Sequence, residues 1–377
     1  MCRISLHRIS GFLAAMVLTG TAAAPTDGTA PAATQQGGAA PAFEAYSRFD
    51  FVPGEKVVAV EDFSQESIGD FPANWNTNAS GEIVTIANRP GRWLKLTGAG
   101  VFVPEFPALA ENFTLEFDLL VAPKFDSGDR LNAAIVELEN LKEPAAWGVA
   151  DNRFHFDVLP EKPESSTQME PRQDGVGVAL VRATIKGFGP DGVPVHVSVW
   201  RQRQRVRVYF NENKVWDVPR ALSPTAKYNA IVFFVPGVDE GSEYYLGNIR
   251  LAAGAPDTRN KLLTEGKWVT HGILFDVNSD KVRPESYGAI KEISNVLGEN
   301  ADVKVQIVGH TDSDGDAAQN LELSKRRAEA VRAVLIAQFK IDGTRLTTDG
   351  KGETQPIDKN ETVAGKANNR RVEFVKM

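Results

Sequence analysis

The apolar residues of this chain change their spacing once, close to residue 252. Before that point they form short runs that alternate with polar residues, and turn-forming Gly, Pro, Asn and Asp separate the runs. After it, apolar residues at helical spacing alternate with short apolar strands. A period of two marks a strand and a period of about 3.6 marks a helix, so the two parts need different folds. The 377 residues therefore divide into an all-β region and a mixed region.

The first region, residues 45–252, is predicted to be an antiparallel β-sandwich domain, because its strands are short, turn residues separate them and no long helical period occurs. Asn211–Lys214 predicts a tight hairpin, since Asn tolerates positive φ. Residues 160–177 hold three prolines and predict a long exposed loop. The expected strands include Trp93–Leu96, Phe113–Val121, Val195–Val199, Val206–Phe210, Ala230–Val235 and Tyr244–Leu251.

The second region, residues 257–377, is predicted to be a compact two-layer α+β domain with the order β-α-β-α-β. A short Ala/Gly/Pro hinge at Ala252–Pro256 precedes it. The expected elements are a strand ending at Phe275, a helix over Ile290–Leu297, a strand over Val303–Ile307, a helix over Ala318–Phe339 and a strand over Arg371–Val375. The fold class of the whole chain is thus an all-β sandwich followed by an α+β domain.

The amino terminus, residues 1–24, has the three parts of a secretory signal peptide: basic residues, the apolar run Gly11–Leu18, and small residues before a proline. We expect cleavage after Ala24. The alternative, a retained membrane anchor, requires about 20 apolar residues, and Thr19–Thr21 interrupts this run. Cys2 precedes the apolar run, so we expect no lipid attachment and no cysteine in the mature chain.

The composition of the chain limits the classes of partner that it is expected to bind. Residues 25–44 have almost no large apolar side chain and predict a flexible linker. The chain has 42 Lys and Arg against 49 Asp and Glu, a net charge of −7. This balance offers no overall attraction to nucleic acid or anionic lipid. No other apolar stretch is long enough to span a bilayer, so we expect no transmembrane span in the mature chain.

One polar stretch of the second region carries candidate chemistry. Gly309–Asp312 is predicted to leave a buried strand and to lead into a helix. On that helix Arg327 lies about 40° from the predicted buried line and Asn320 about 60°. A guanidinium turned toward the core needs a carboxylate or an anionic ligand, and Asp312 is the nearest candidate in sequence. The spacing leaves two alternatives open, a structural Asp312–Arg327 ion pair or a binding site. The residues that define the predicted buried line are Leu323, Ala330, Val334 and Ala337.

These motifs resemble those of the OmpA-like peptidoglycan-binding domain, from Gly272 to the end of the chain. The matching residues are Gly309-His310-Thr311-Asp312, Asn320, Leu323-Ser324, Arg327-Ala328, Gly350-Lys351-Gly352-Glu353, Gln355-Pro356 and Asn369-Arg370-Arg371-Val372-Glu373. The resemblance implies non-covalent binding of peptidoglycan through the diaminopimelate side chain of the stem peptide.

Carried over by position, the resemblance implies that Asp312 meets the ammonium of diaminopimelate and that Arg327 meets its carboxylate. The other ligand-binding residues implied are Asn320, Thr311, Leu323 and Asp276. A zwitterion needs one anion and one cation in fixed geometry, which agrees with this assignment. Asp314 and Asp316 depart from the family pattern and add negative charge that would weaken binding of the ligand's carboxylate.

Metal and cofactor motifs are incomplete. Asp312, Asp314 and Asp316 fit the first positions of a calcium loop, but Ala317 and Leu323 stand where Gly and Glu are required. The G-x-G-x-x-G pattern at Gly187–Gly192 is followed by no helix. The histidines have no zinc-ligand spacing. We therefore expect neither a metal nor a cofactor.

The sandwich region gives weaker functional signals. Arg201, Arg203, Arg205 and Arg207 alternate along the chain, which fits a solvated sheet face, a hairpin turn around Gln202–Gln204, or an anion or glycan surface. The region resembles laminin-G or concanavalin-like sandwiches through Asp62-Phe63, Gly69–Trp75 and the residues from Trp200 to Asp217. Such sandwiches often bind carbohydrate, which the fold alone does not establish.

The function that these signals favour is that of a non-enzymatic cell-envelope protein in the periplasm, associated with the outer membrane. Its OmpA-like domain would bind peptidoglycan, and its sandwich would bind a carbohydrate or an envelope protein. The alternative is a glycan-active enzyme with a catalytic sandwich, which would need two carboxyl groups about 5–10 Å apart in a cleft. A third reading, an ion-motor stator anchor, requires an amino-terminal transmembrane helix.

Overall fold

The computed structural model describes residues 49–123, 129–141, 143–162, 164–177, 180–237, 242–255 and 257–377. The predicted signal peptide and linker, with Ala24 and Cys2, lie outside the described residues, as does Pro256 of the predicted hinge. The described residues from Phe49 to Met377 belong to one compact unit. Of the helices in the described ranges, none has both the length and the apolar character that crossing a bilayer demands.

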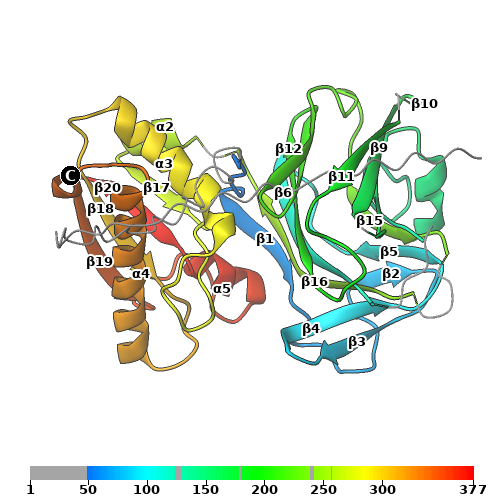
Figure 1. Cartoon of the computed structure of the whole chain (residues 1–377), viewed down its shortest axis with the longest axis horizontal. Coiled ribbons are helices and arrows are strands. Elements are labelled where there is room, and N and C mark those ends of the chain that lie inside the picture. The colour runs from blue at the N-terminus through cyan, green and yellow to red at the C-terminus, as the bar shows by residue number, and fades with distance from the viewer. Residues whose placement is uncertain are drawn as a thin grey trace, which may run out of the picture. The chain divides into compact units, whose positions relative to one another are not determined.

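Two antiparallel eight-stranded sheets form the region before residue 254 (Figure 1). The strands of the first are β1 (Lys56–Glu61), β3 (Gly81–Ile86), β4 (Arg89–Leu96), β6 (Asn112–Val121), β12 (Val195–Gln202), β13 (Arg205–Phe210), β14 (Asn213–Val218) and β16 (Tyr244–Ala253). The strands of the second are β2 (Trp75–Thr77), β5 (Gly100–Pro104), β7 (Leu131–Val136), β8 (Arg153–Leu159), β9 (Ser165–Gln173), β10 (Val176–Gly177), β11 (Val181–Ile185) and β15 (Ala230–Val235).

The first sheet has the order β14-β13-β12-β6-β16-β4-β3, with β1 paired to β16. The second has the order β10-β9-β8-β7-β15-β5-β2, with β11 paired to β9. Phe117 of β6 and Phe233 of β15 meet between the sheets, with ring centroids 5.2 Å apart. Both rings belong to one large buried cluster fed by both sheets. The predicted all-β sandwich is therefore confirmed.

The turns of the sandwich agree with the sequence in two places. Asn211, with φ of 49°, makes the turn between β13 and β14, as expected for that hairpin. A second turn around Arg203, with φ of 53°, joins β12 to β13 and confirms the hairpin reading of the arginine run. Arg201 in that run is not solvated, because it is 6% exposed and its guanidinium lies 5.0 Å from the ring centroid of Tyr228.

The predicted loop over residues 160–177 is wrong, because Ser165–Gln173 forms β9 and pairs with both β8 and β11. The buried positions of this strand include Ser165 and Thr167, so its inward face is too polar to show an apolar alternation. The Thr167 hydroxyl is satisfied internally, since it donates to the carbonyl oxygen of Asp157 at 2.6 Å. A strand of this kind is visible only once its neighbours are in place.

The carboxy-terminal region is a four-stranded sheet with helices packed on it (Figure 1). Its elements are α2 (Thr258–Leu263), β17 (Lys267–Thr270), α3 (Tyr287–Glu299), β18 (Val305–His310), α4 (Ala317–Ala337), β19 (Leu346–Gly352), α5 (Val363–Asn369) and β20 (Val372–Lys376). Short 3₁₀ helices lie at Pro284–Ser286 and Gly343–Arg345, and another, Pro144–Val149, belongs to the sandwich.

The strand order of this sheet is β17-β20-β18-β19, and β18 and β19 are parallel. The predicted β-α-β-α-β order is present, with β19 and α5 added before the last strand. The first strand ends at Thr270 rather than at Phe275, which makes only an isolated bridge to Val282. The α+β class is confirmed.

The buried face of α4 differs from the predicted line. Its buried residues are Asn320, Ser324, Ala328, Val331 and Leu335, whereas Ala337 is exposed. The cause is close packing on the sheet: a Cβ atom at Gly309 would overlap the backbone of Ser324 on α4. The hydroxyl of Ser324 accepts a hydrogen bond from the amide of Gly352 at 2.9 Å. At Gly309 and Gly352, therefore, a small residue of α4 rather than a large apolar one faces the strands.

The segment Phe49–Gly54, which precedes β1, packs into the carboxy-terminal core. Phe49, Phe51 and Val52 share a buried cluster with the apolar residues of α3 and of the four-stranded sheet. On the sandwich side, the Phe51 ring lies 6.1 Å from that of Trp200. The side chain of Asn368 on α5 hydrogen-bonds both the N–H and the carbonyl of Val57 at 2.9 Å, so β1 lies beside α5 (Figure 1).

Candidate functional site

Asp312 lies directly after β18, where the chain turns toward α4, and is 7% exposed. Its Oδ2 accepts from Nη1 of Arg370, which stands between α5 and β20. Its Oδ1 accepts from the amide of Asp314 at 3.2 Å. The ion-pair partner of Asp312 is therefore Arg370, and the Asp312–Arg327 pair that the spacing left open does not form.

Arg327 projects from α4 without a carboxylate partner. Its Nε donates to the carbonyl oxygen of Ser279 at 2.9 Å, and its guanidinium carbon lies 4.9 Å from the ring centroid of Phe275. No acidic side chain in the described ranges lies within ion-pair distance of it. Burial lowers the pKa of Arg327 and the charge of Arg370 lowers it further, while Asp312 opposes both. The group remains a cation whose charge a carbonyl and a ring only partly compensate.

The other predicted site residues take different roles. Asn320 donates to the carbonyl oxygen of Asp314 at 3.0 Å and to Glu353 at 2.7 Å, so it braces the loop after β18. Thr311 is 5% exposed, and its hydroxyl finds no hydrogen-bond partner among the described residues. Leu323 is half-buried on α4. Asp276 is exposed, with an oxygen 3.4 Å from the ammonium of Lys281.

A cleft of about 760 Å³ lies between the first sheet of the sandwich and the carboxy-terminal region. Of the predicted residues, Arg327 lines it, whereas Asp312, Asn320, Thr311, Leu323 and Asp276 are not among its lining residues. Arg370 lines it too, so Asp312 reaches the cleft through its partner. The sandwich wall of the cleft includes Glu116, Asp118, His196 and Arg250.

Sequence reasoning missed both Arg370 as a partner and the whole sandwich wall. Arg370 stood inside the matched motif but had no assigned role. Glu116 and Asp118 alternate on β6 and so share a face, which was the one available signal. Nothing in the sequence connects them with residues 196 and 250, because only strand pairing brings β6, β12 and β16 together.

The sandwich wall holds a buried ionic cluster around His196. Its Nδ1 lies 2.7 Å from Oδ1 of Asp118, and its Nε2 lies 3.5 Å from Oε2 of Glu116. Asn248 donates to the second oxygen of Asp118 at 2.6 Å, and Nη1 of Arg250 lies 3.6 Å from Glu116. Burial alone would lower the pKa of His196, but the two carboxylates raise it to about 10. The ring is therefore protonated at neutral pH.

The two carboxylates of this cluster are held by cations and an amide, unlike the proton donor of a glycan hydrolase. A hydrolytic pair needs one carboxyl group whose pKa is raised, so that it can donate a proton. Burial raises the pKa of Glu116 and Asp118, but the bonds to His196 reverse this and leave both below their usual range. Glu61, whose pKa burial raises to about 7, is not a lining residue, although its neighbours Val60 and Asp62 are.

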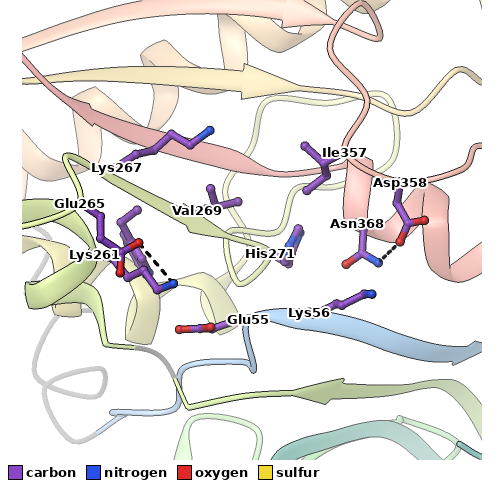
Figure 2. A pocket seen from close by; sticks show the side chains of 11 residues that line it. Glu55, Lys56, Lys261, Glu265, Lys267, Val269, His271, Ile357, Asp358 and Asn368 are labelled. Carbon is purple, nitrogen blue, oxygen red and sulfur yellow. Dashed lines mark hydrogen bonds and ion pairs between the residues drawn. The ribbon is translucent and has the colours of Figure 1, made fainter.

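A second groove, of about 640 Å³, lies beside β1, β17 and α5. Figure 2 shows two pairs among its polar groups: Lys261 lies 3.5 Å from Glu265, and Asn368 donates to Asp358 at 2.9 Å. None of the predicted site residues lines it. Within the described ranges no three His, Cys, Asp or Glu side chains are grouped as metal ligands.

The residues on the carboxy-terminal side of the cleft fall within a known family. Residues 274–370 are an OmpA family domain. The OmpA family domain contains Asp312, Arg327 and Arg370, and it excludes the sandwich.

Two curated proteins share this region. Outer membrane porin F of Pseudomonas aeruginosa is 41% identical over 101 residues, which are 27% of this chain and 29% of that protein. Outer-membrane lipoprotein YfiB of the same species is 36% identical over 103 residues, 27% of this chain and 61% of that protein. The chain thus spans less than two thirds of the length of either relative.

A solved structure gives a weaker likeness. The peptidoglycan-associated lipoprotein from Burkholderia pseudomallei is 25% identical, and the match covers 32% of this chain and 98% of that one. The TM-score is 0.28, which is too low to bear on the fold.

Proposed function

We propose that this protein binds peptidoglycan without covalent attachment, through the diaminopimelate side chain of the stem peptide, and that it is a non-enzymatic protein of the cell envelope. The observation that carries the proposal is Arg327, a half-buried guanidinium that lines the cleft. Its partners are a carbonyl oxygen and an aromatic ring, and no carboxylate of the described residues lies within ion-pair distance of it. A carboxylate is the group that a planar guanidinium binds best.

We propose a zwitterion rather than a simple anion as the ligand. Asp312 lies next to this cation through Arg370, and its carboxylate has capacity for a further donor. An ammonium at Asp312 and a carboxylate at Arg327 would each meet a group of the opposite charge. The OmpA family match, which contains all three residues, supports the same assignment.

The location and the second partner belong to the same proposal. The names of the curated relatives support a place in the periplasm at the outer membrane, which is where a secretory signal would deliver the chain. We keep the division into a sandwich at 45–252, holding a glycan or an envelope protein, and an OmpA-like domain at 257–377.

Arg327→Gln should weaken binding to purified sacculi at least about tenfold, so that the protein is no longer retained on them. The fold of the variant should lose only a little stability. Arg326→Gln is the matched control, because Arg326 is the next residue, is half exposed and has only a 4.0 Å contact with Asp280.

Asp312→Asn should lose binding and also stability, since it leaves Arg370 unpaired. Sacculus pull-down and thermal unfolding of the same preparations measure both, with free diaminopimelate as competitor. Retention of folded Arg327→Gln at the wild-type level would contradict the proposal.

Thr311→Val should leave the free energy of unfolding unchanged or raise it by about 1 kcal/mol, because the hydroxyl that it removes is buried and unpartnered. If that hydroxyl instead serves the ligand, the same variant should weaken sacculus binding several-fold. Thr311→Ser, which keeps the hydroxyl, is the control for binding. A large loss of stability in Thr311→Val would show that the hydroxyl is structural.

A further inference from the structure

Arg250 of β16 is a cation of the sandwich whose hydrogen bonds are incomplete. Its two Nη atoms donate to the same acceptor, the carbonyl oxygen of His271, at 3.3 Å each. No group in the described part of the chain accepts from its Nε. Its side chain is 13% exposed, and the exposed part faces the cleft that Arg327 lines. A guanidinium has five N–H donors, so several remain available.

The carboxylates near Arg250 already interact with other side chains. One oxygen of Glu116 lies 3.6 Å from Nη1 of Arg250, and the other lies 3.5 Å from Nε2 of His196. Asp118 is occupied by His196 and Asn248. The lining of the cleft as a whole has six arginines and His196 but only Asp62, Glu116 and Asp118 as acids. The cleft therefore presents more positive than negative groups to a ligand.

Arg370 connects the two walls electrostatically. Burial lowers the pKa of Arg250 and of Arg327, and the charge of Arg370 lowers both further, while Glu116 opposes the shift at Arg250. Arg370 thus acts on one guanidinium of each wall, and Glu116 and Asp312 compensate part of this positive charge. Bringing like charges together in a partly buried cleft is costly unless an anion joins them.

The apolar part of the cleft fits a peptide. Ile273, Leu274 and Phe275 line its carboxy-terminal wall, and Val277 at the rim is 84% exposed. The volume lies within the range of sites that enclose ligands larger than one amino acid. Arg250 of the sandwich wall lines the same cleft as Arg327, so one ligand can meet both.

We propose that Arg250 of the sandwich binds a second carboxylate of the same ligand, so that the cleft selects a stem peptide carrying a free α-carboxylate on the residue that precedes diaminopimelate. The proposal rests on the proposed function and extends it, since diaminopimelate remains the anchor at Arg327. It gives the sandwich a direct part in recognition. The competing account is structural: Arg250 only ties β16 to the loop at His271.

The experiment uses the full chain and three probes in isothermal titration: free meso-diaminopimelate, the tripeptide L-alanyl-γ-D-glutamyl-meso-diaminopimelate, and that tripeptide with its glutamyl α-carboxylate amidated. Amidation removes one charge at nearly constant size. Wild type should prefer the free carboxylate at least about tenfold, as expected for a charged hydrogen-bonded contact. Arg250→Gln should reduce the preference below about twofold and leave affinity for diaminopimelate itself unchanged within that margin.

Arg203→Gln is the matched control, the same change at an exposed sandwich arginine that does not line the cleft, and it should keep the preference. If Arg250→Gln does not fold, Arg250→Lys replaces it. Lysine keeps the positive charge beside Glu116 but lacks the planar guanidinium that binds a carboxylate through two N–H groups. It should therefore lower the preference for the tripeptide with the free carboxylate several-fold. Equal binding of the two tripeptides by wild type, or a full preference in folded Arg250→Gln, would overturn the inference while leaving the proposed function intact. If none of the three probes binds, the proposed function itself fails.

Discussion

Gly288→Ala is expected to lower the free energy of unfolding by about 3 kcal/mol, although alanine is the better helix former. Gly288 lies in the first turn of α3, where a Cβ atom would overlap the carbonyl oxygen of Phe51 and lie 2.9 Å from its carbon. These are backbone atoms, so no side-chain rotation relieves the overlap. The segment Phe49–Gly54 would have to leave the helix, and the buried rings of Phe49 and Phe51 would leave with it.

Gly298→Ala in the same helix is the control. No atom lies within 4 Å of the added Cβ there, so this change should stabilise the chain by about 1 kcal/mol. Denaturant unfolding of both variants, followed by far-UV circular dichroism, separates the two effects. Equal stability of the two variants would show that Phe49–Gly54 does not pack on α3. That contact was invisible in the sequence, because Phe51 and Gly288 are far apart along the chain.

The fold class could be predicted because it depends on local periodicity. Alternation marked the strands of the sandwich, and one Asn with positive φ marked the turn after β13. The predictions were wrong where small or hydroxyl-bearing residues, rather than large apolar ones, are packed in the interior. On α4 the glycines of the adjacent strands bring small residues such as Ser324 against the sheet, and β9 buries hydroxyls that are satisfied by neighbouring backbone.

Only the carboxy-terminal wall of the candidate site could be predicted from the sequence. A contiguous motif pointed to Asp312 and Arg327, since both lie within one strand-loop-helix unit. The partner of Asp312 depended on where α5 ends, which sets the position of Arg370. The other wall joins residues of β6, β12 and β16, which are neighbours solely through the order of the first sheet. Spacing along a sequence carries no information of that kind.

His196→Gln is expected to cost about 3–5 kcal/mol of unfolding free energy at pH 7. The change leaves two negatively charged groups, the buried Glu116 and the partly buried Asp118, on the same face of β6 without the cation between them. Glutamine can donate one hydrogen bond to either carboxylate but supplies no charge. Arg250 would remain near Glu116 alone. Denaturant unfolding at pH 7 measures the loss directly, and a His196→Gln, Glu116→Gln double variant should recover part of it.

The unfolding free energy lost in His196→Gln should also depend on pH. The direction of that dependence follows from the contacts of His196 with Asp118 and Glu116. The folded pKa of about 10 is above the ordinary value near 6.5, so the stabilisation from His196 is complete below pH 6.5 and disappears as the pH rises toward 10. The gap in stability between wild type and His196→Gln should therefore narrow over that window. His155→Gln is the control, because burial lowers the pKa of His155 to about 4, and its gap from wild type should stay constant from pH 6.5 to 10. A constant gap for His196→Gln as well would mean that the ring is neutral in the folded protein, and that the sandwich wall of the cleft carries less positive charge than the geometry indicates.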